Sequence, residues 1–127
     1  MKPIPIVTDK APKALGAYSQ GMKVGNLIFT SGQLAIVPET GAKLTGPIEE
    51  QADRALRNVL AVVEAGGGSA ETVIKTTAFI ADAELWGKVN EVYARFFPNH
   101  KPARSIVPSK SLPFGFLIEI EAVAAEK

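Results

Sequence analysis

The sequence predicts an α+β fold, in which a mixed β-sheet carries two helices packed on one of its faces. Two segments have apolar residues at helical spacing, and four others are rich in β-branched residues or alternate between apolar and polar side chains. The predicted order is β-β-α-β-α-β, and no linker or repeat divides the chain, so we expect a single domain over residues 1–127. The other face of the sheet would stay uncovered, and self-association is the economical way to cover it.

The first two strands are predicted over residues 16–24 and 27–31. Between them stands the pair Gly25-Asn26, whose residues accept the positive φ angles of a tight hairpin turn. We therefore expect an antiparallel hairpin, followed by a loop that prolines and glycines interrupt.

The clearest helix is predicted over residues 48–65. Pro47 stands at its start, where a missing N–H is tolerated, and Glu49 and Glu50 suit the positive end of the helix dipole. The glycines at 66–68 end the helix, because glycine accepts the left-handed conformation of a C-terminal cap. One helix face is apolar and comprises Ala52, Leu56, Val59, Leu60 and Val63.

A third strand is predicted over residues 72–80, which are rich in β-branched side chains. Asp82 is a suitable N-cap for a second helix that runs to about Phe97, and Pro98 ends this helix. Its apolar stripe comprises Leu85, Val89, Val92 and Phe96, and we expect Trp86, Phe96 and Phe97 to belong to the core.

The last strand is predicted over residues 116–124, after a long segment at 99–113 that contains several prolines. Side chains alternate along this strand. One face carries Phe116, Ile118, Ile120 and Ala122, and the other carries Leu117, Glu119, Glu121 and Val123.

The composition excludes several classes of function. The net charge of +1 argues against a protein built to neutralise nucleic-acid phosphates. Cysteine is absent and His100 is the single histidine, which excludes disulfides and disfavours a zinc site, and we expect His100 on a surface loop. Residues 1–10 do not form a secretory signal, and no apolar run approaches the roughly 20 residues that span a bilayer. We therefore expect a soluble cytoplasmic protein without a membrane association.

Five short motifs follow one another along nearly the whole chain. They are Gly16-Ala17-Tyr18-Ser19-Gln20, Ser31-Gly32-Gln33, the N-E-V-Y-A-R-F-F stretch at 90–97, the P-A-R-S stretch at 102–105, and the E-I-E-A-V-A stretch at 119–124. Each motif is weak alone, but their joint order and spacing resembles the RidA (YjgF/UK114) family of imine and enamine deaminases.

The resemblance implies a chorismate-mutase-like fold and a homotrimer with a cleft between each pair of neighbouring subunits. It implies hydrolysis of reactive 2-imino acids, such as 2-iminobutanoate and 2-iminopropanoate, to 2-keto acids and ammonia, with no metal and no organic cofactor. By motif position, the arginine that holds the carboxylate of the 2-imino or 2-keto acid is Arg104. The family's other site positions fall on Tyr18, Ser31, Asn90 and Glu119.

These residue types suit imine hydrolysis, which needs a grip on the carboxylate, a placed water and proton transfer. The planar guanidinium of Arg104 can hold a carboxylate through two parallel hydrogen bonds. Glu119 can order a water or accept its proton, and Tyr18 can orient that water or close over the substrate. Ser31 and Asn90 can hydrogen-bond the imine nitrogen or the carboxylate.

Each residue also has a structural interpretation. Arg104 and Glu119 can serve in ion pairs, and Tyr18 can be a packed strand aromatic. Ser31 and Asn90 can satisfy backbone groups.

The chain departs from the family pattern at two positions. Ala17 replaces a common proline, and Ile106 replaces a common cysteine, which removes thiol-based regulation. Phe114 and Phe116 add aromatic bulk near the last strand and could deny room to longer substrate side chains.

Two other functions remain alternatives. A non-catalytic trimer that binds small carboxylates, or a holdase, would keep Arg104 and show no turnover. Endoribonuclease or translation-inhibitor activity, which names of family members also state, has little support, because no histidine pair is present for acid–base cleavage. A local basic stretch without acidic residues comprises Arg95, His100, Lys101, Arg104 and Lys110, and nucleic acid is not expected as a partner.

Overall fold

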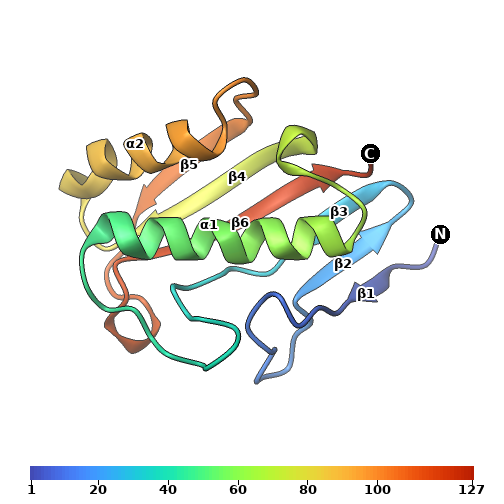
Figure 1. Cartoon of the computed structure of the whole chain (residues 1–127), viewed down its shortest axis with the longest axis horizontal. Coiled ribbons are helices and arrows are strands. Elements are labelled where there is room, and N and C mark those ends of the chain that lie inside the picture. Colours follow the sequence, from blue (N-terminus) through green and yellow to red (C-terminus); the bar gives the residue numbers. More distant parts are fainter.

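Six strands form one mixed sheet, and two α-helices lie against one side of it (Figure 1). The structure is a computed structural model that describes residues 1–127. The strand order is β1-β2-β3-β6-β4-β5, and only the β4–β5 pair is parallel. The elements are β1 (Ile4–Ile6), β2 (Gly21–Val24), β3 (Leu27–Thr30), α1 (Ile48–Ala65), β4 (Val73–Ile80), α2 (Trp86–Phe96), β5 (Ala103–Pro108) and β6 (Ile118–Ala125). The predicted α+β class, with both helices on one face, is confirmed.

The core lies between the helices and the sheet. Helix α1 has the predicted bounds, and its apolar face packs over β6 and β3. The predicted alternation of the last strand is also confirmed, because Ile118 and Ile120 are fully buried while Glu121 is exposed. Glu119 therefore points to the side of the sheet that the helices do not cover.

Two edge strands were not predicted. Strand β1 contains Pro5, which is tolerated there because an edge strand leaves one row of N–H groups unpaired. Strand β5 lies within the proline-punctuated segment and pairs in parallel with β4. The first predicted strand begins at Gly21, because residues 16–20 form tight turns in which the Tyr18 N–H donates to the Gly16 carbonyl over 2.9 Å.

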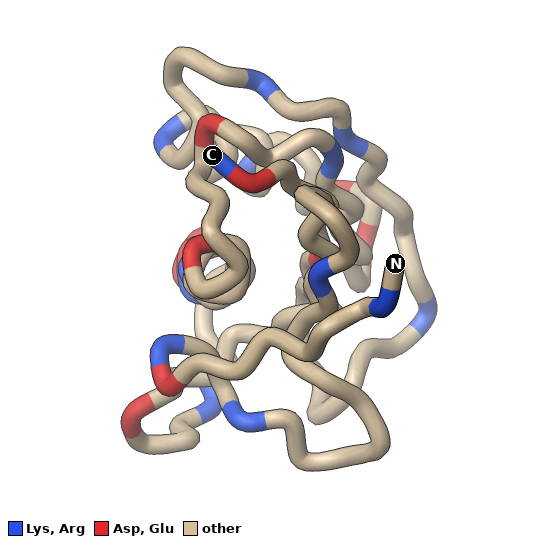
Figure 2. The backbone as a smooth tube through the Cα atoms, turned by 90° about the vertical axis from the view of Figure 1, so that its right-hand side faces the viewer, with Lys and Arg blue, Asp and Glu red and all other residues tan.

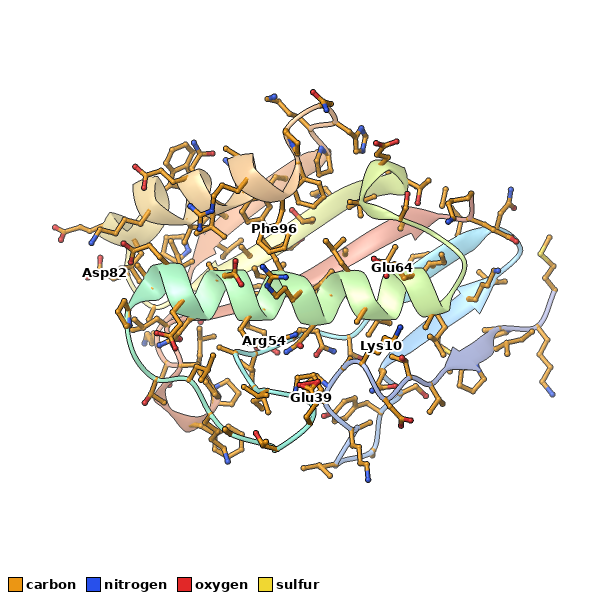
Figure 3. The ribbon with its side chains drawn as sticks, viewed as in Figure 1. Lys10, Glu39, Arg54, Glu64, Asp82 and Phe96 are labelled. Atoms are coloured by element: carbon orange, nitrogen blue, oxygen red, sulfur yellow. The ribbon has the colours of Figure 1, made fainter.

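The second helix begins as predicted and differs from the prediction at one aromatic residue. The Asp82 side chain accepts a hydrogen bond from the Glu84 N–H over 2.9 Å and caps a short 3₁₀ turn before α2. Phe96 lies between the two helices (Figure 3), where the Arg57 guanidinium stands 5.5 Å from its ring centre. Trp86, expected in the core, is 47% exposed, because it occupies the outer side of the first turn of α2.

His100 is half-buried and not simply a surface residue. Its Nε2 lies 2.6 Å from the Val73 carbonyl oxygen, so the imidazole ties the loop after α2 to the start of β4.

The other face of the sheet carries no helix (Figure 2). Strand register places Met22, Leu27, Phe29 and Val107 on this free face, and all four side chains are exposed. An exposed set of large apolar side chains on one face marks a contact surface. Neither helix is both long and apolar enough to cross a bilayer.

Candidate functional site

Arg104 lies on the edge strand β5, on the side of the sheet that faces α2. Its partner in the sheet register is Thr76 of β4, whose side chain is fully buried under α2. The guanidinium of Arg104 lies over two aromatic rings, 4.8 Å from the ring centre of Tyr93 and 5.3 Å from that of Trp86. Both rings come from α2, so this helix supplies two cation–π contacts to the guanidinium.

The Tyr93 ring is held in place beside Arg104 by a hydrogen bond and by burial. Its hydroxyl donates to the Thr76 Oγ1 over 3.1 Å, and its side chain is almost fully buried. Burial raises the pKa of the Tyr93 hydroxyl, although the hydrogen bond to Thr76 and the charge of Arg104 act in the opposite direction. The hydroxyl therefore stays protonated at neutral pH and keeps donating to Thr76.

A cavity of about 310 Å³ lies beside Arg104, between α2 and the loop that precedes β5. Asn90, which the family resemblance assigns to the same site as Arg104, also lines this cavity. Lys101 lines the cavity as well and adds a second positive charge beside Arg104. The sequence alone places Lys101 only in a local basic stretch. The full lining is Asn90, Tyr93, Ala94, Phe97, Lys101, Pro102 and Arg104.

Glu119 lies on β6, on the free face of the sheet, where it is opposite Phe79 of β4. Gly32 makes room for its carboxylate, because a Cβ at residue 32 would collide with the Glu119 Oε2. Two backbone hydrogen bonds hold the segment after β3 against β6. The Gln33 N–H donates to the Ile120 carbonyl over 2.7 Å, and the Gln33 carbonyl accepts from the Ile120 N–H over 3.0 Å. The Ser31-Gly32-Gln33 motif thus shapes the space around Glu119.

The Glu119 carboxyl is half-buried, and its pKa is raised. Burial is the larger cause, and the negative charge of Glu121 is the smaller one. A carboxyl with a raised pKa is a stronger base once ionised, which suits acceptance of a proton from water.

Ser31 directly precedes Gly32, the residue that adjoins the Glu119 carboxylate, and it also contacts the turn that carries Tyr18. The Ser31 hydroxyl donates to the Ser19 carbonyl, so Ser31 holds the Tyr18-Ser19 turn. The Tyr18 ring packs against Gly16, and its side chain remains 55% exposed. Sequence reasoning missed the structural part of this motif, which is Gln20.

Gln20 anchors the N-terminal segment to this motif. Its Oε1 accepts from the Thr8 N–H over 2.8 Å, and its Nε2 donates to the Pro12 carbonyl over 2.8 Å. The side chain is almost fully buried, so an amide that can both donate and accept is needed at this position.

The predicted site residues therefore form two separate groups in one chain. Arg104 and Asn90 form the cation group at the β5 edge, beside α2. Glu119 lies on the free face, and Gly32 and the Ser31 hydroxyl connect it to the Tyr18-Ser19 turn; Tyr18, Ser31 and Glu119 are called the carboxylate group below. The sheet separates Arg104 from Glu119.

Comparison with known proteins identifies the class. The family model for endoribonuclease L-PSP matches residues 8–126. Reactive Intermediate Deaminase A of Arabidopsis thaliana is 43% identical over 94% of this chain and 64% of its own length, and the 2-iminobutanoate/2-iminopropanoate deaminase of Rattus norvegicus is 41% identical over 95% of this chain and 88% of its own. The crystal structure of Escherichia coli TdcF with bound serine has a TM-score of 0.92 and 41% identity, and covers 98% of this chain and 99% of that one.

The fold and these relatives together define a class of small proteins in which several members are named deaminases. The chain belongs to the RidA/YjgF family, as its motifs predicted.

Proposed function

We propose that this protein hydrolyses 2-imino acids to 2-keto acids and ammonia, in clefts between the subunits of a homotrimer. Each cleft combines Arg104 and Asn90 of one subunit with Tyr18, Ser31 and Glu119 of its neighbour. The observation that carries this proposal is the placement of Arg104 and Glu119 on opposite sides of one sheet. Within one chain the sheet separates Arg104, which would bind the substrate carboxylate, from Glu119, which would act as the base. Both can act on one substrate when a second copy of the chain supplies one of the two residues.

The free face supports assembly through this surface. Its exposed apolar side chains lie on β2, β3 and β5, and Glu119 lies on the same face. Burial of apolar area is the main favourable term in association. A contact that is repeated head to tail and closes into a ring produces a cyclic oligomer.

In the proposed reaction, Arg104 binds the substrate carboxylate through two parallel hydrogen bonds. This contact fixes the C2 carbon of the iminium against a water molecule that donates a hydrogen bond to Glu119, with Tyr18 beside it. As the new C–O bond forms at C2, the water proton passes to Glu119 and the C=N electron pair moves to nitrogen.

The carbinolamine then breaks down. Glu119 returns its proton to the nitrogen, the C–N bond breaks as ammonia leaves, and loss of the hydroxyl proton gives the 2-keto acid. The departing ammonia takes up the hydroxyl proton, so iminium and water are balanced by keto acid and ammonium. Arg104 also stabilises the substrate in the cleft throughout, since its contact does not change between these steps.

A binding protein without turnover is the second candidate, because a relative with this fold has been crystallised with bound serine. The two functions differ in their response to substitution. Arg104→Ala removes ligand binding in both cases, whereas Glu119→Gln spares binding and removes only turnover if the protein is an enzyme. Nucleic acid is not proposed as a partner, because the one basic stretch is short and cationic and anionic residues are otherwise interspersed around the molecule (Figure 2).

The test follows the decay of 2-iminobutanoate and 2-iminopropanoate that an amino-acid-oxidising enzyme generates in situ. Wild-type protein should accelerate the decay, and Arg104→Ala should abolish the acceleration. Arg57→Ala is the matched control, because Arg57 is an exposed arginine on α1 that is paired with Asp53. Unchanged decay in the presence of folded, assembled wild-type protein would refute the deaminase function.

A further inference from the structure

A second cavity, of about 580 Å³, lies next to the carboxylate group. Its lining residues come from the loops at 7–20 and 31–47 and from the turn at Pro113–Gly115, and these segments lie below α1 in Figure 1. Its lining includes Leu15, Tyr18, Gly32 and Phe114. Glu39 and Lys43 stand on the loop that forms its other wall (Figure 3 labels Glu39).

Large apolar side chains that would ordinarily be buried converge on this cavity. Leu15 is 90% exposed and Phe114 is 68% exposed, and the ring of Tyr18 also lines the space. Their shared position, rather than their number, is informative, because several apolar groups around one concave space form a binding surface.

Phe114 is held in an unfavourable backbone conformation at this wall. Its φ of 58° makes it the single non-glycine residue in the left-handed region, where a bulky side chain is an outlier. The ring is supported on two sides, by an edge contact with Phe116 at 6.2 Å between centres and by the Lys43 ammonium at 4.8 Å. Strain that surrounding contacts maintain is typical of functional sites.

The cavity adjoins the carboxylate group through two of its lining residues. Tyr18 and Gly32 line the cavity, and Gly32 also touches the Glu119 carboxylate. A substrate whose C2 carbon faces Glu119 therefore has this space beside it. Phe116 is buried in the core and Phe114 forms a wall, so neither residue fills the space that a longer side chain needs.

We propose that this cavity receives the substrate's side chain, and that the preferred substrates are 2-imino acids with large apolar side chains, branched aliphatic or aromatic. This inference rests on the proposed deaminase function and names the substrate class of the same site. A methyl or ethyl side chain would leave most of the 580 Å³ unfilled. A larger apolar group displaces water from it and contacts Leu15 and Phe114.

The test compares kcat/KM for imines formed from alanine, 2-aminobutyrate, leucine and phenylalanine by an amino-acid oxidase. The wild-type protein should favour the leucine and phenylalanine imines over the alanine imine by about tenfold or more, the scale of discrimination that a few apolar contacts give. Leu15→Ala and Phe114→Ala should each lower this preference several-fold. Val7→Ala, an exposed apolar residue outside the cavity, should leave it unchanged.

The outcomes separate the two proposals. Hydrolysis of the alanine imine with no preference for the larger imines would overturn the side-chain cavity and leave the deaminase function standing. Equal losses on all four imines in Leu15→Ala and Phe114→Ala would overturn it as well, because a specificity wall must act on large substrates more than on small ones. No hydrolysis of any imine would overturn the deaminase function itself.

Discussion

Arg104 and Glu119 project from opposite faces of the same sheet, although only β4 lies between their strands. The register pairs Arg104 with the buried Thr76 and Glu119 with Phe79, and neighbouring positions on β4 point to opposite sides. In the proposed function one chain supplies two halves of different clefts, and substitutions in each half should have different effects.

Substitutions of Arg104 test whether its positive charge alone, or also the planar shape of the guanidinium, binds the substrate carboxylate. Arg104→Lys keeps the cation but loses the planar fork, so kcat/KM should fall roughly 100-fold, and Arg104→Ala should fall further. Binding of the 2-keto acid product, measured by calorimetry, should weaken in the same order. An Arg104→Lys variant that binds and turns over like wild type would contradict the two-bond grip on the carboxylate.

Trp86 should act as a positioning residue for Arg104. Trp86→Ala removes one ring from beneath the guanidinium, a cation–π contact worth about 1 kcal/mol, so KM should rise about fivefold with a smaller change in kcat. Trp86→Phe should restore most of the loss. Because the side chain is 47% exposed, the melting temperature should hardly move, and a lower melting temperature with unchanged KM would show a merely structural role.

The pH profile should report the ionisation of Glu119. If its carboxylate accepts the water proton, kcat/KM falls at low pH, with an apparent pKa above the ordinary range of glutamate, because burial raises the pKa of Glu119. Glu121→Gln removes the second cause of the shift, so the acid limb should move to lower pH. If the apparent pKa of the acid limb is the same in Glu121→Gln as in wild type, a group other than Glu119 controls the profile.

The ionised Glu119 carboxylate should also lower the free energy of unfolding at neutral pH. A group whose pKa is raised on folding contributes stability that is fully present below its unfolded pKa and is lost as pH rises through its folded pKa. At neutral pH, Glu119→Gln should therefore raise the free energy of unfolding while it removes turnover, and the difference should vanish in acid. Denaturant unfolding at the two pH values measures it, and a variant less stable than wild type at neutral pH would contradict the assignment.

Gly32→Ala tests whether the space around Glu119 matters. The added Cβ would collide with the carboxylate, so turnover should drop roughly tenfold or more while keto-acid binding persists. Gly87→Ala is the matched control, since a Cβ there meets nothing and alanine favours the helix by roughly 0.5–1 kcal/mol. Full activity in Gly32→Ala would mean that the carboxylate position is not critical.

Much of the fold follows from local chemistry. The acidic first turn and the glycines after residue 65 determine α1, and the alternation along β6 is enough to place Glu119 on the side opposite Ile118 and Ile120. The edge strands are different. Strand β5 is short, half-exposed and bounded by prolines, so it has no apolar period, and it forms only because β4 offers a pairing partner.

The candidate site could be predicted as residues but not as an arrangement. Motif order selects Tyr18, Ser31, Asn90, Arg104 and Glu119. The face of Arg104 depends on the parallel register of β5, which no local pattern specifies. Trp86 was expected in the core because it is aromatic and helical, yet its exposed position beside Arg104 is a tertiary feature.

The most direct measurement of the proposed shared site is complementation between inactive subunits. Arg104→Ala and Glu119→Gln, each with its own tag, are co-expressed, and only oligomers that carry both tags are purified. In a ring of three, one cleft joins an intact Arg104 to an intact Glu119, so the mixed trimers should show about one third of wild-type imine hydrolysis. Trimers of either variant alone should show none. Mixed trimers that stay inactive, while equally tagged wild-type trimers work, would contradict a site shared between subunits.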